Sequence, residues 1–206
     1  MVKKTLLLLV LAALVAGGVF AQEGPVKFSA GGGFDMNMSS VTSKKTKDEI
    51  QHSLMLYGFY GAFDVGLTAI PLSFELDVGM GFGEYSIKVG DVGLDPLKSF
   101  IGLDLGFYAK YTFIDKEKWM LFAGAGIGYP LILKADDYEK PMDFSQMNIV
   151  GLFGGGYKFN EHLSLIGRLD GGIGFQSKFL KDADIGDAIE ATPFGIAFKV
   201  GVMYAF

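Results

Sequence analysis

Residues 70–82 read IPLSFELDVGMGF, and this stretch decides the fold because apolar residues alternate in it with polar or small ones. One parity carries Phe74 and Leu76, and the other carries Glu75 and Asp77. A β-strand sends successive side chains to opposite faces, whereas a helix would mix these acids with the apolar residues. The alternation is also longer than an average soluble strand. It predicts a long strand with one apolar face and one charged face.

The same period of two recurs along the chain. It is clearest in residues 70–82, 101–113, 163–175 and 194–206, and weaker in 26–38, 53–63, 119–129 and 147–159. The parity of 53–63 stays ambiguous because almost all of its residues are apolar or aromatic. Eight such segments predict an all-β fold, a closed antiparallel eight-stranded transmembrane β-barrel that turns its apolar faces to lipid.

The connections between these segments alternate in length. Short turns are expected at 64–66, 114–118 and 160–162, and long polar connections at 39–52, 84–99, 131–146 and 176–192. Outer-membrane barrels place short turns in the periplasm and longer loops outside. Tyr111, Phe113, Trp119, Tyr157, Phe159, Tyr204 and Phe206 fall near the short turns, as expected for an interfacial aromatic girdle.

The N-terminus has the layout of a secretory signal peptide. Lys3 and Lys4 precede an apolar run that ends in Val19-Phe20-Ala21, a small-residue exit. We expect cleavage after Ala21, so that 1–21 is the signal peptide and 22–206 the barrel domain. A retained transmembrane helix is the competing interpretation, but the run is short and Gly17 and Gly18 interrupt it.

Composition excludes several other classes of protein. The chain has no cysteine, so it has neither disulfides nor a lipid-modified N-terminal cysteine. Its 18 basic and 23 acidic residues give a net charge of -5, without a basic cluster that would follow a phosphate backbone. We therefore expect no nucleic-acid partner. No motif has the spacing of metal ligands or of a nucleotide loop, so no cofactor is expected.

The face opposite the apolar one carries equal numbers of basic and acidic residues. These inward residues are Lys27, Lys110, Lys158, Arg168 and Lys199, and Asp35, Glu75, Asp77, Asp104 and Asp170. An eight-stranded barrel is only just wide enough to be filled by its own side chains. We therefore expect a network of ion pairs that plugs the lumen. Counting along the strands places the bases lower and the acids higher, which suggests an acidic vestibule above a cation-rich floor.

Glycines also line the outer half of the predicted lumen. They include Gly79, Gly81, Gly102, Gly126, Gly128, Gly172, Gly174 and Gly195. Strand curvature and room for tight closure account for them in the preferred interpretation. The alternative is a cup, open to the outside, that holds a cation or a small solute.

The C-terminal octet KVGVMYAF, residues 199–206, resembles the signal by which the barrel-assembly machinery recognises its clients. Lys199 is the polar residue, Gly201 follows two positions later, and Tyr204 and the terminal Phe206 are aromatic. With its four long and three short connections, the chain resembles the small eight-stranded outer-membrane barrels of the OmpA transmembrane-domain, OmpX and OmpW group. The resemblance implies an outer-membrane location, with lipid, the assembly machinery and periplasmic chaperones as partners.

The expected function is a structural or surface-interaction role in the outer membrane, without catalysis. An extracellular ligand would bind through the long connections. One alternative is a narrow, porin-like channel for small or hydrophobic solutes, as in the OmpW group. The second is an outer-leaflet lipid-modifying enzyme, because His162 and Ser164 resemble the His-x-Ser pair of lipid A deacylases. Their short turn, however, lies at the periplasmic end, and His52 and Ser53 point to opposite faces of a strand.

Overall fold

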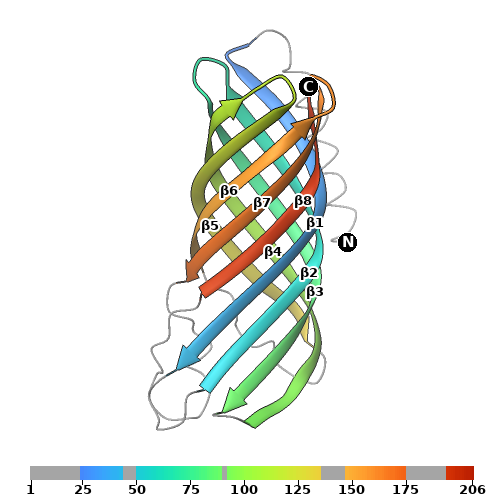
Figure 1. Cartoon of the computed structure of the whole chain (residues 1–206). Coiled ribbons are helices and arrows are strands. Elements are labelled where there is room, and N and C mark those ends of the chain that lie inside the picture. Colours follow the sequence, from blue (N-terminus) through green and yellow to red (C-terminus); the bar gives the residue numbers. More distant parts are fainter. Residues whose placement is uncertain (1–23, 44–49, 90–91, 136–146, 175–193) are drawn as a thin grey trace.

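The computed structural model describes residues 24–43, 50–89, 92–135, 147–174 and 194–206, and it is a closed barrel of antiparallel strands (Figure 1). The strands are β1 (Val26–Ser43), β2 (Ile50–Leu67), β3 (Leu72–Val89), β4 (Val92–Asp115), β5 (Trp119–Ala135), β6 (Asn148–Lys158), β7 (Leu163–Gly174) and β8 (Phe194–Ala205). The predicted fold class and the eight strands are confirmed. The predicted signal peptide, residues 1–21, lies outside the described residues.

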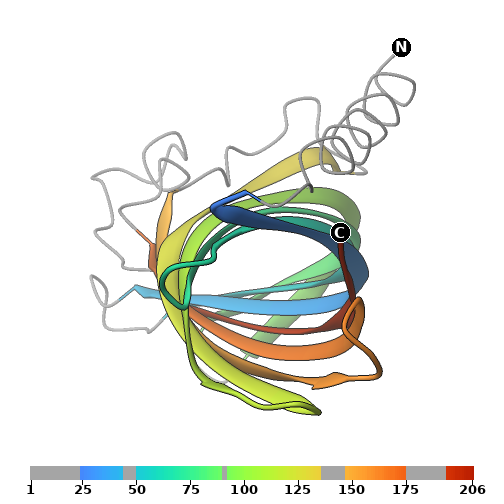
Figure 2. The same ribbon diagram turned by 90° about the horizontal axis from the view of Figure 1, so that it is seen from above.

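Pairing between the first and last strands closes the barrel. Ser29 of β1 lies opposite Ala205 of β8, and the ladder continues to Ser40 opposite Phe194. Along this seam neither strand keeps an unpaired edge that would pair with another chain. Viewed along the axis, the strands form a ring (Figure 2). Among the described residues, no helix is long and apolar enough to cross a membrane.

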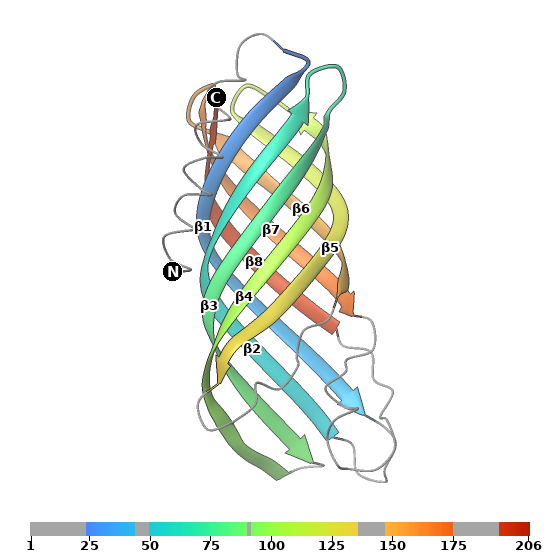
Figure 3. The same ribbon diagram turned by 180° about the vertical axis from the view of Figure 1, so that it is seen from behind.

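The two ends of the barrel differ in their connections. The short-turn end carries the turns at residues 68–71, 116–118 and 159–162, and the long-connection end is opposite to it. β1 to β5 have 17 to 24 residues, whereas β6 to β8 have 11 or 12. As a result, β1 to β4 extend beyond β6 to β8 at the long-connection end (Figure 3).

The first short turn lies later in the chain than predicted. Residues 64–66 belong to β2, and the turn is formed by 68–71, where the amide of Thr68 donates to the carbonyl oxygen of Pro25 at 2.9 Å. Ile70 and Pro71 consequently lie outside β3. An Asp-x-Gly sequence is typical of turns, but here it continues the inward parity of Tyr60 and Ala62 into the lumen.

Much of the chain predicted as long connections is strand. β3 continues to Val89 and β4 begins at Val92, so nearly all of 84–99 is paired, and β1, β2 and β5 also extend into predicted connections. Backbone pairing does not require an apolar face, and alternation is lost where neither side of a strand meets lipid or an apolar core. Residues 44–49, 136–146 and 175–193 lie outside the described residues.

The outer surface is a broad belt of uncovered apolar side chains. Leu76, Phe82, Phe107 and Leu169 are each exposed by half or more of their surface. The parity of β2 is now settled, since Phe59 faces outward with 74% of its surface exposed, whereas Leu56 is buried inside the barrel. A water-soluble monomer rarely exposes so large an apolar surface, whereas the lipid-facing side of a membrane barrel requires one.

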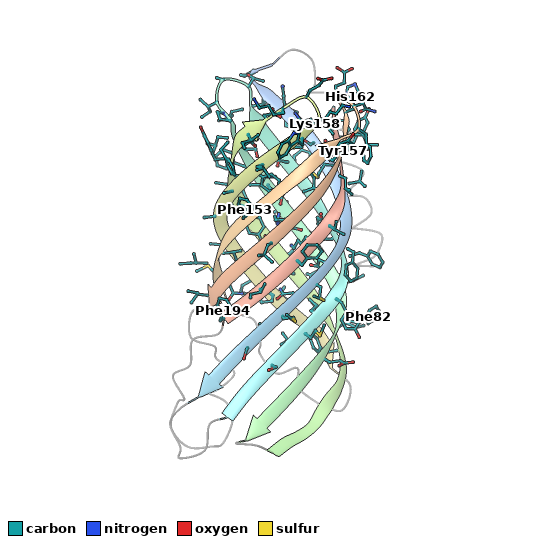
Figure 4. All side chains as sticks on the ribbon, in the orientation of Figure 1. Phe82, Phe153, Tyr157, Lys158, His162 and Phe194 are labelled. Atoms are coloured by element: carbon teal, nitrogen blue, oxygen red, sulfur yellow. The ribbon has the colours of Figure 1, made fainter. Side chains whose placement is uncertain are left out.

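Aromatic rings mark the short-turn end of this belt. Tyr111, Trp119 and Tyr204 are about half exposed there, as is Tyr157, which Figure 4 places near the short-turn end with Lys158 and His162. Phe153 lies farther along the wall, and Phe82 and Phe194 lie toward the long-connection end (Figure 4). Amphipathic rings are favoured at the boundary between headgroups and water, so this end matches one membrane interface.

Candidate functional site

The described part of the lumen contains nine buried charged side chains. Three are basic and six are acidic: Lys110, Arg168 and Lys199, with Asp35, Asp64, Glu75, Asp77, Asp104 and Asp170. The register brings them together. Asp64 lies opposite Glu75 across β2 and β3, while Arg168 lies opposite Lys199 and Lys199 opposite Asp35 around the seam. Period-two alternation turns all of them inward, away from the apolar belt.

Arg168 is the centre of this charge network. On its own strand it pairs with Asp170, with 2.7 Å between Nε and Oδ1. Its Nη2 donates to Oδ2 of Asp77 at 2.7 Å, and its Nη1 donates to Glu75. Arg168 is on β7 and both of these partners are on β3, which lies four strands away in either direction around the barrel. The guanidinium therefore spans the lumen from one wall to the opposite one.

Two lysines complete the network. Nζ of Lys199 donates to Oδ2 of Asp77 at 2.5 Å, so that one oxygen binds both Lys199 and Arg168. Nζ of Lys110 donates to Oε2 of Glu75 at 2.7 Å and also pairs with Asp64. Since every one of these side chains is buried, their attraction is far less screened than at a protein surface.

Aromatic rings flank each of the three cations. The guanidinium carbon of Arg168 lies 4.8 Å from the ring centre of Tyr108, and the Nζ atoms of Lys199 and Lys110 lie 5.3 Å and 5.4 Å from those of Tyr60 and Phe122. At these distances the π faces attract the cations. Tyr108 and Phe122 also pack with Val150, Leu152 and Ile166 inside the barrel.

Lumen glycines leave room for these large side chains. A side chain at Gly106 would run into the ring of Tyr108, one at Gly83 into the ring of Phe100, and one at Gly102 into Leu56. Small residues facing large ones are typical of the interior of small barrels. At these three positions the space beside the glycine is filled by side-chain packing within the lumen.

Some predicted lumen charges lie apart from the network. Lys158 pairs with the exposed Asp115 near the short-turn end, and Lys27 is exposed. Asp35 and Asp104 are buried near Lys199, which lies opposite Asp35 in the register and attracts both carboxylates. Glu75 and Asp77 were predicted to belong to an acidic layer above the bases, but they bind Lys110, Arg168 and Lys199 directly.

Sequence reasoning missed Asp64, because it assigned this residue to a turn. The available signal was the alternation along the strand, because Asp64 has the same parity as the inward-facing Tyr60 and Ala62. The rings of Tyr60, Tyr108 and Phe122 were also missed as partners of the cations. Their inward parity was readable for Tyr108, but which cation each ring meets depends on the register between strands.

A cavity of about 770 Å³ lies on the short-turn side of the network. Glu75, Lys110 and Arg168 line its deep end, and Lys27 and Lys158 line it nearer the turns. Its wall also includes turn residues such as Glu161, so it opens at the short-turn end. The alternative expectation from the sequence was a cup at the opposite end, lined by glycines.

The side chain of His162 contacts the C-terminal strand β8. Its Nδ1 lies 3.0 Å from the carbonyl oxygen of Ala205, and its ring stacks on Tyr204 with 5.6 Å between centres. The His162 carbonyl oxygen also accepts from the amide of Ala205 at 2.7 Å. These contacts give His162 a structural role at the end of β8, and the side chain of His52 lies outside the described residues.

The C-terminal octet forms one side of the barrel seam. Lys199 points into the lumen, whereas Tyr204 faces outward and is about half exposed. Gly201 lies against β1 where a side chain would meet the Tyr60 hydroxyl, and the amide of Phe206 donates to the carbonyl oxygen of Phe28 at 3.0 Å. In the folded barrel the octet is thus part of β8 and its pairing with β1.

No protein-family profile and no curated protein matches the chain, but solved structures do. The outer membrane protein OprG from Pseudomonas aeruginosa is 16% identical, with a TM-score of 0.56 over 87% of this chain and 95% of that one. The outer membrane protein AlkL, determined by solid-state NMR in DMPC bilayers, is 12% identical, with a TM-score of 0.50 over 90% and 93%. The chain therefore has the fold of the small eight-stranded outer-membrane barrels.

Proposed function

We propose that this chain is an integral protein of a bacterial outer membrane, where its barrel has a structural or surface-interaction role and forms no open pore. The apolar belt, the aromatic end and the fold all support the membrane location. In this proposal residues 1–21 are removed on export, and residues 22–206 form the barrel domain. The short turns then face the periplasm, and the long connections face the outside.

The main support for a closed lumen is the contact of Arg168 with Glu75 and Asp77 across the barrel. Lys199 and Lys110 add further links to the same two acids. A solute that passed through would have to separate several buried ion pairs, each of which leaves an uncompensated charge when it opens. The network therefore favours a plugged barrel over a water-filled channel.

Liposome swelling tests this proposal directly. Vesicles that contain the refolded protein are expected to swell in graded sugars no faster than protein-free vesicles, because the network blocks the lumen. The matched variant is Arg168→Ala with Glu75→Ala, which removes both contacts of Arg168 across the lumen together with the charges of Arg168 and Glu75. It is expected to admit the smallest sugar faster than the wild type does.

A narrow channel is the competing function, and the same experiment separates the two. Wild-type vesicles whose swelling is fast and falls with solute size would reject the plugged barrel. In that case the cavity of about 770 Å³ at the short-turn end would be one mouth of the channel.

The partners that we propose are the outer-membrane lipid, periplasmic chaperones and the barrel-assembly machinery. The last proposal rests on Lys199, Gly201, Tyr204 and Phe206, whose pattern resembles the assembly signal. The proposed contacts for an extracellular ligand are the connections predicted at 39–52, 84–99, 131–146 and 176–192, although most of 84–99 is strand.

A further inference from the structure

The cavity at the short-turn end is a recess closed at its inner end. Glu75, Lys110 and Arg168 form that end, and Glu75 binds both of the bases. Lys158 and His162 line the recess near its mouth (Figure 4). Its volume of about 770 Å³ lies in the range typical of small-molecule sites. A solute that enters from the short-turn end therefore meets a floor of paired charges.

One half of this recess is apolar. Its large apolar side chains come from β5, β7 and β8, and they are Met120, Phe122, Ile166 and Met203. Glycines on the neighbouring strands make room for them. A Cβ atom on Gly156 would lie 2.5 Å from Cδ1 of Ile166 and 3.3 Å from Cε of Met120, and one on Gly31 would run into Sδ of Met203. The apolar side chains therefore lie along the wall and leave the middle of the recess open.

The other half of the recess is polar. Strands β1 to β4 contribute hydroxyl and charged side chains to it, which are Ser29, Asp64, Ser73, Glu75, Lys110 and Thr112. Oγ of Ser73 donates to Oδ2 of Asp64 at 3.3 Å, and Asp64 pairs with Lys110. Hydroxyl groups can both donate and accept hydrogen bonds, and carboxylates accept them. This half therefore suits the hydroxyl groups of a ligand.

The two halves face each other across the lumen. Ser73 on β3 and Ile166 on β7 are four strands apart in either direction around the closed barrel, so they line opposite walls. Water beside the apolar wall is favourably replaced by an apolar group. On the polar wall, a ligand has to supply hydrogen bonds in place of water. A ligand with one apolar and one polar side meets both requirements.

The charges that line the recess favour neither sign. Among the described residues, five basic and five acidic side chains belong to its lining. A charged ligand would lose hydration on entry without meeting a surplus of the opposite charge, which is unfavourable. The lining therefore favours a molecule without net charge.

We propose that this recess binds a small neutral molecule with hydroxyl groups on one side and an aromatic ring on the other. The hydroxyl groups bind to the polar half, and the ring packs on the apolar half. The thioethers of Met120 and Met203 are favourable partners for such a ring. The inference rests on the proposed plugged barrel, because the charge network supplies the closed end, and it goes beyond that proposal by assigning a class of ligand.

The test compares probes that carry one or both sides of such a ligand. The barrel is refolded in phospholipid nanodiscs, which leave both of its ends accessible, and binding is measured by equilibrium dialysis against empty nanodiscs. The neutral probe para-nitrophenyl glucoside is expected to bind saturably. Methyl glucoside lacks the ring and is expected to bind at least about tenfold more weakly, because it buries less apolar surface. The anionic para-nitrophenyl glucuronide is also expected to bind more weakly than the neutral glucoside.

Two matched variants locate the binding. Ser29 lines the recess, so Ser29→Trp places an indole ring in it and is expected to abolish saturable binding of para-nitrophenyl glucoside. The control is Phe28→Trp, whose side chain belongs to the outer face of the same strand, and it is expected to retain binding. If Ser29→Trp does not fold, Met120→Gln with Met203→Gln makes the apolar half polar and is expected to remove the preference for para-nitrophenyl over methyl glucoside.

Three results would overturn the proposal. In the first, the wild type shows no saturable binding of para-nitrophenyl glucoside. In the second, methyl glucoside or the glucuronide binds as tightly as the neutral aromatic probe. In the third, Ser29→Trp binds that probe as tightly as the wild type does. Liposome swelling keeps the plug separate from the site, because fast swelling with saturable binding would reject the plugged barrel alone, and slow swelling without saturable binding would reject the ligand site alone.

Discussion

Replacing Arg168 with methionine is expected to destabilise the folded barrel by about 3–5 kcal/mol, the cost typical of removing one partner from a buried ionic group. Arg168 is 4% exposed and is the shared partner of Glu75, Asp77 and Asp170. Methionine keeps much of the volume but leaves these acids with only the two lysines of the network. Urea unfolding of the barrel in phospholipid vesicles measures the difference.

Two further variants separate charge from shape at this position. Arg168→Lys keeps the positive charge but loses the planar group that reaches both walls, so it is expected to recover only part of the stability. Arg168→Met with Glu75→Gln and Asp170→Asn removes two of the carboxylates that lose Arg168 as a partner and is expected to be more stable than Arg168→Met alone. If Arg168→Met unfolds within about 1 kcal/mol of the wild type, a surface-like value for an ion pair, the network does not hold the walls together.

The sequence was sufficient to predict the barrel because lipid imposes a simple pattern. In hydrocarbon every outward residue of a strand must be apolar, and every inward residue is free of that demand. Residues 70–82 show both rules at once, since Leu76 is half exposed while Glu75 and Asp77 are buried next to it in sequence. The positions of strands inside the membrane therefore follow from alternation.

Outside the membrane this demand disappears, and so does the signal. β3 and β4 remain paired as far as Val89 and Val92, where polar residues no longer alternate with a lipid-facing set. The first turn was misplaced for a related reason, because Asp64 and Gly66 fit either a turn or an inward strand face. The pairing of Asp64 with Ser29 and Glu75 on the neighbouring strands, and its ion pair with Lys110 on β4, distinguish the two.

The members of the charge network were readable from parity, but their pairing was not. Arg168 and Glu75 are 93 residues apart, and they meet because closure and register place β7 opposite β3. Alternation in one strand carries no information about the offset of another strand. For that reason the sequence suggested separate acidic and basic layers, whereas in the structure Glu75 and Asp77 lie among the bases.

A charged side chain is expected to be tolerated on the inner face of a strand and to be destabilising on its outer face. Leu76, between Glu75 and Asp77, is a position at which the outer face can be tested. Leu76→Arg is expected to destabilise the barrel in phospholipid vesicles by about 2–4 kcal/mol, the cost of a basic side chain near the bilayer midplane. Leu76 is 52% exposed and lies opposite Phe107 within the apolar belt. Reversible urea unfolding in vesicles measures the change.

The control places the same charge at the membrane edge. Ile70 is 49% exposed in the first short turn, so Ile70→Arg is expected to cost only about 0–1 kcal/mol near the interface. A difference between the two variants is expected from their different depths, and a general effect of an added arginine on folding would not produce it. If Leu76→Arg were as stable as Ile70→Arg, the belt would not face hydrocarbon. Exclusion of charge from lipid would then no longer explain why the acids on either side of Leu76 point inward.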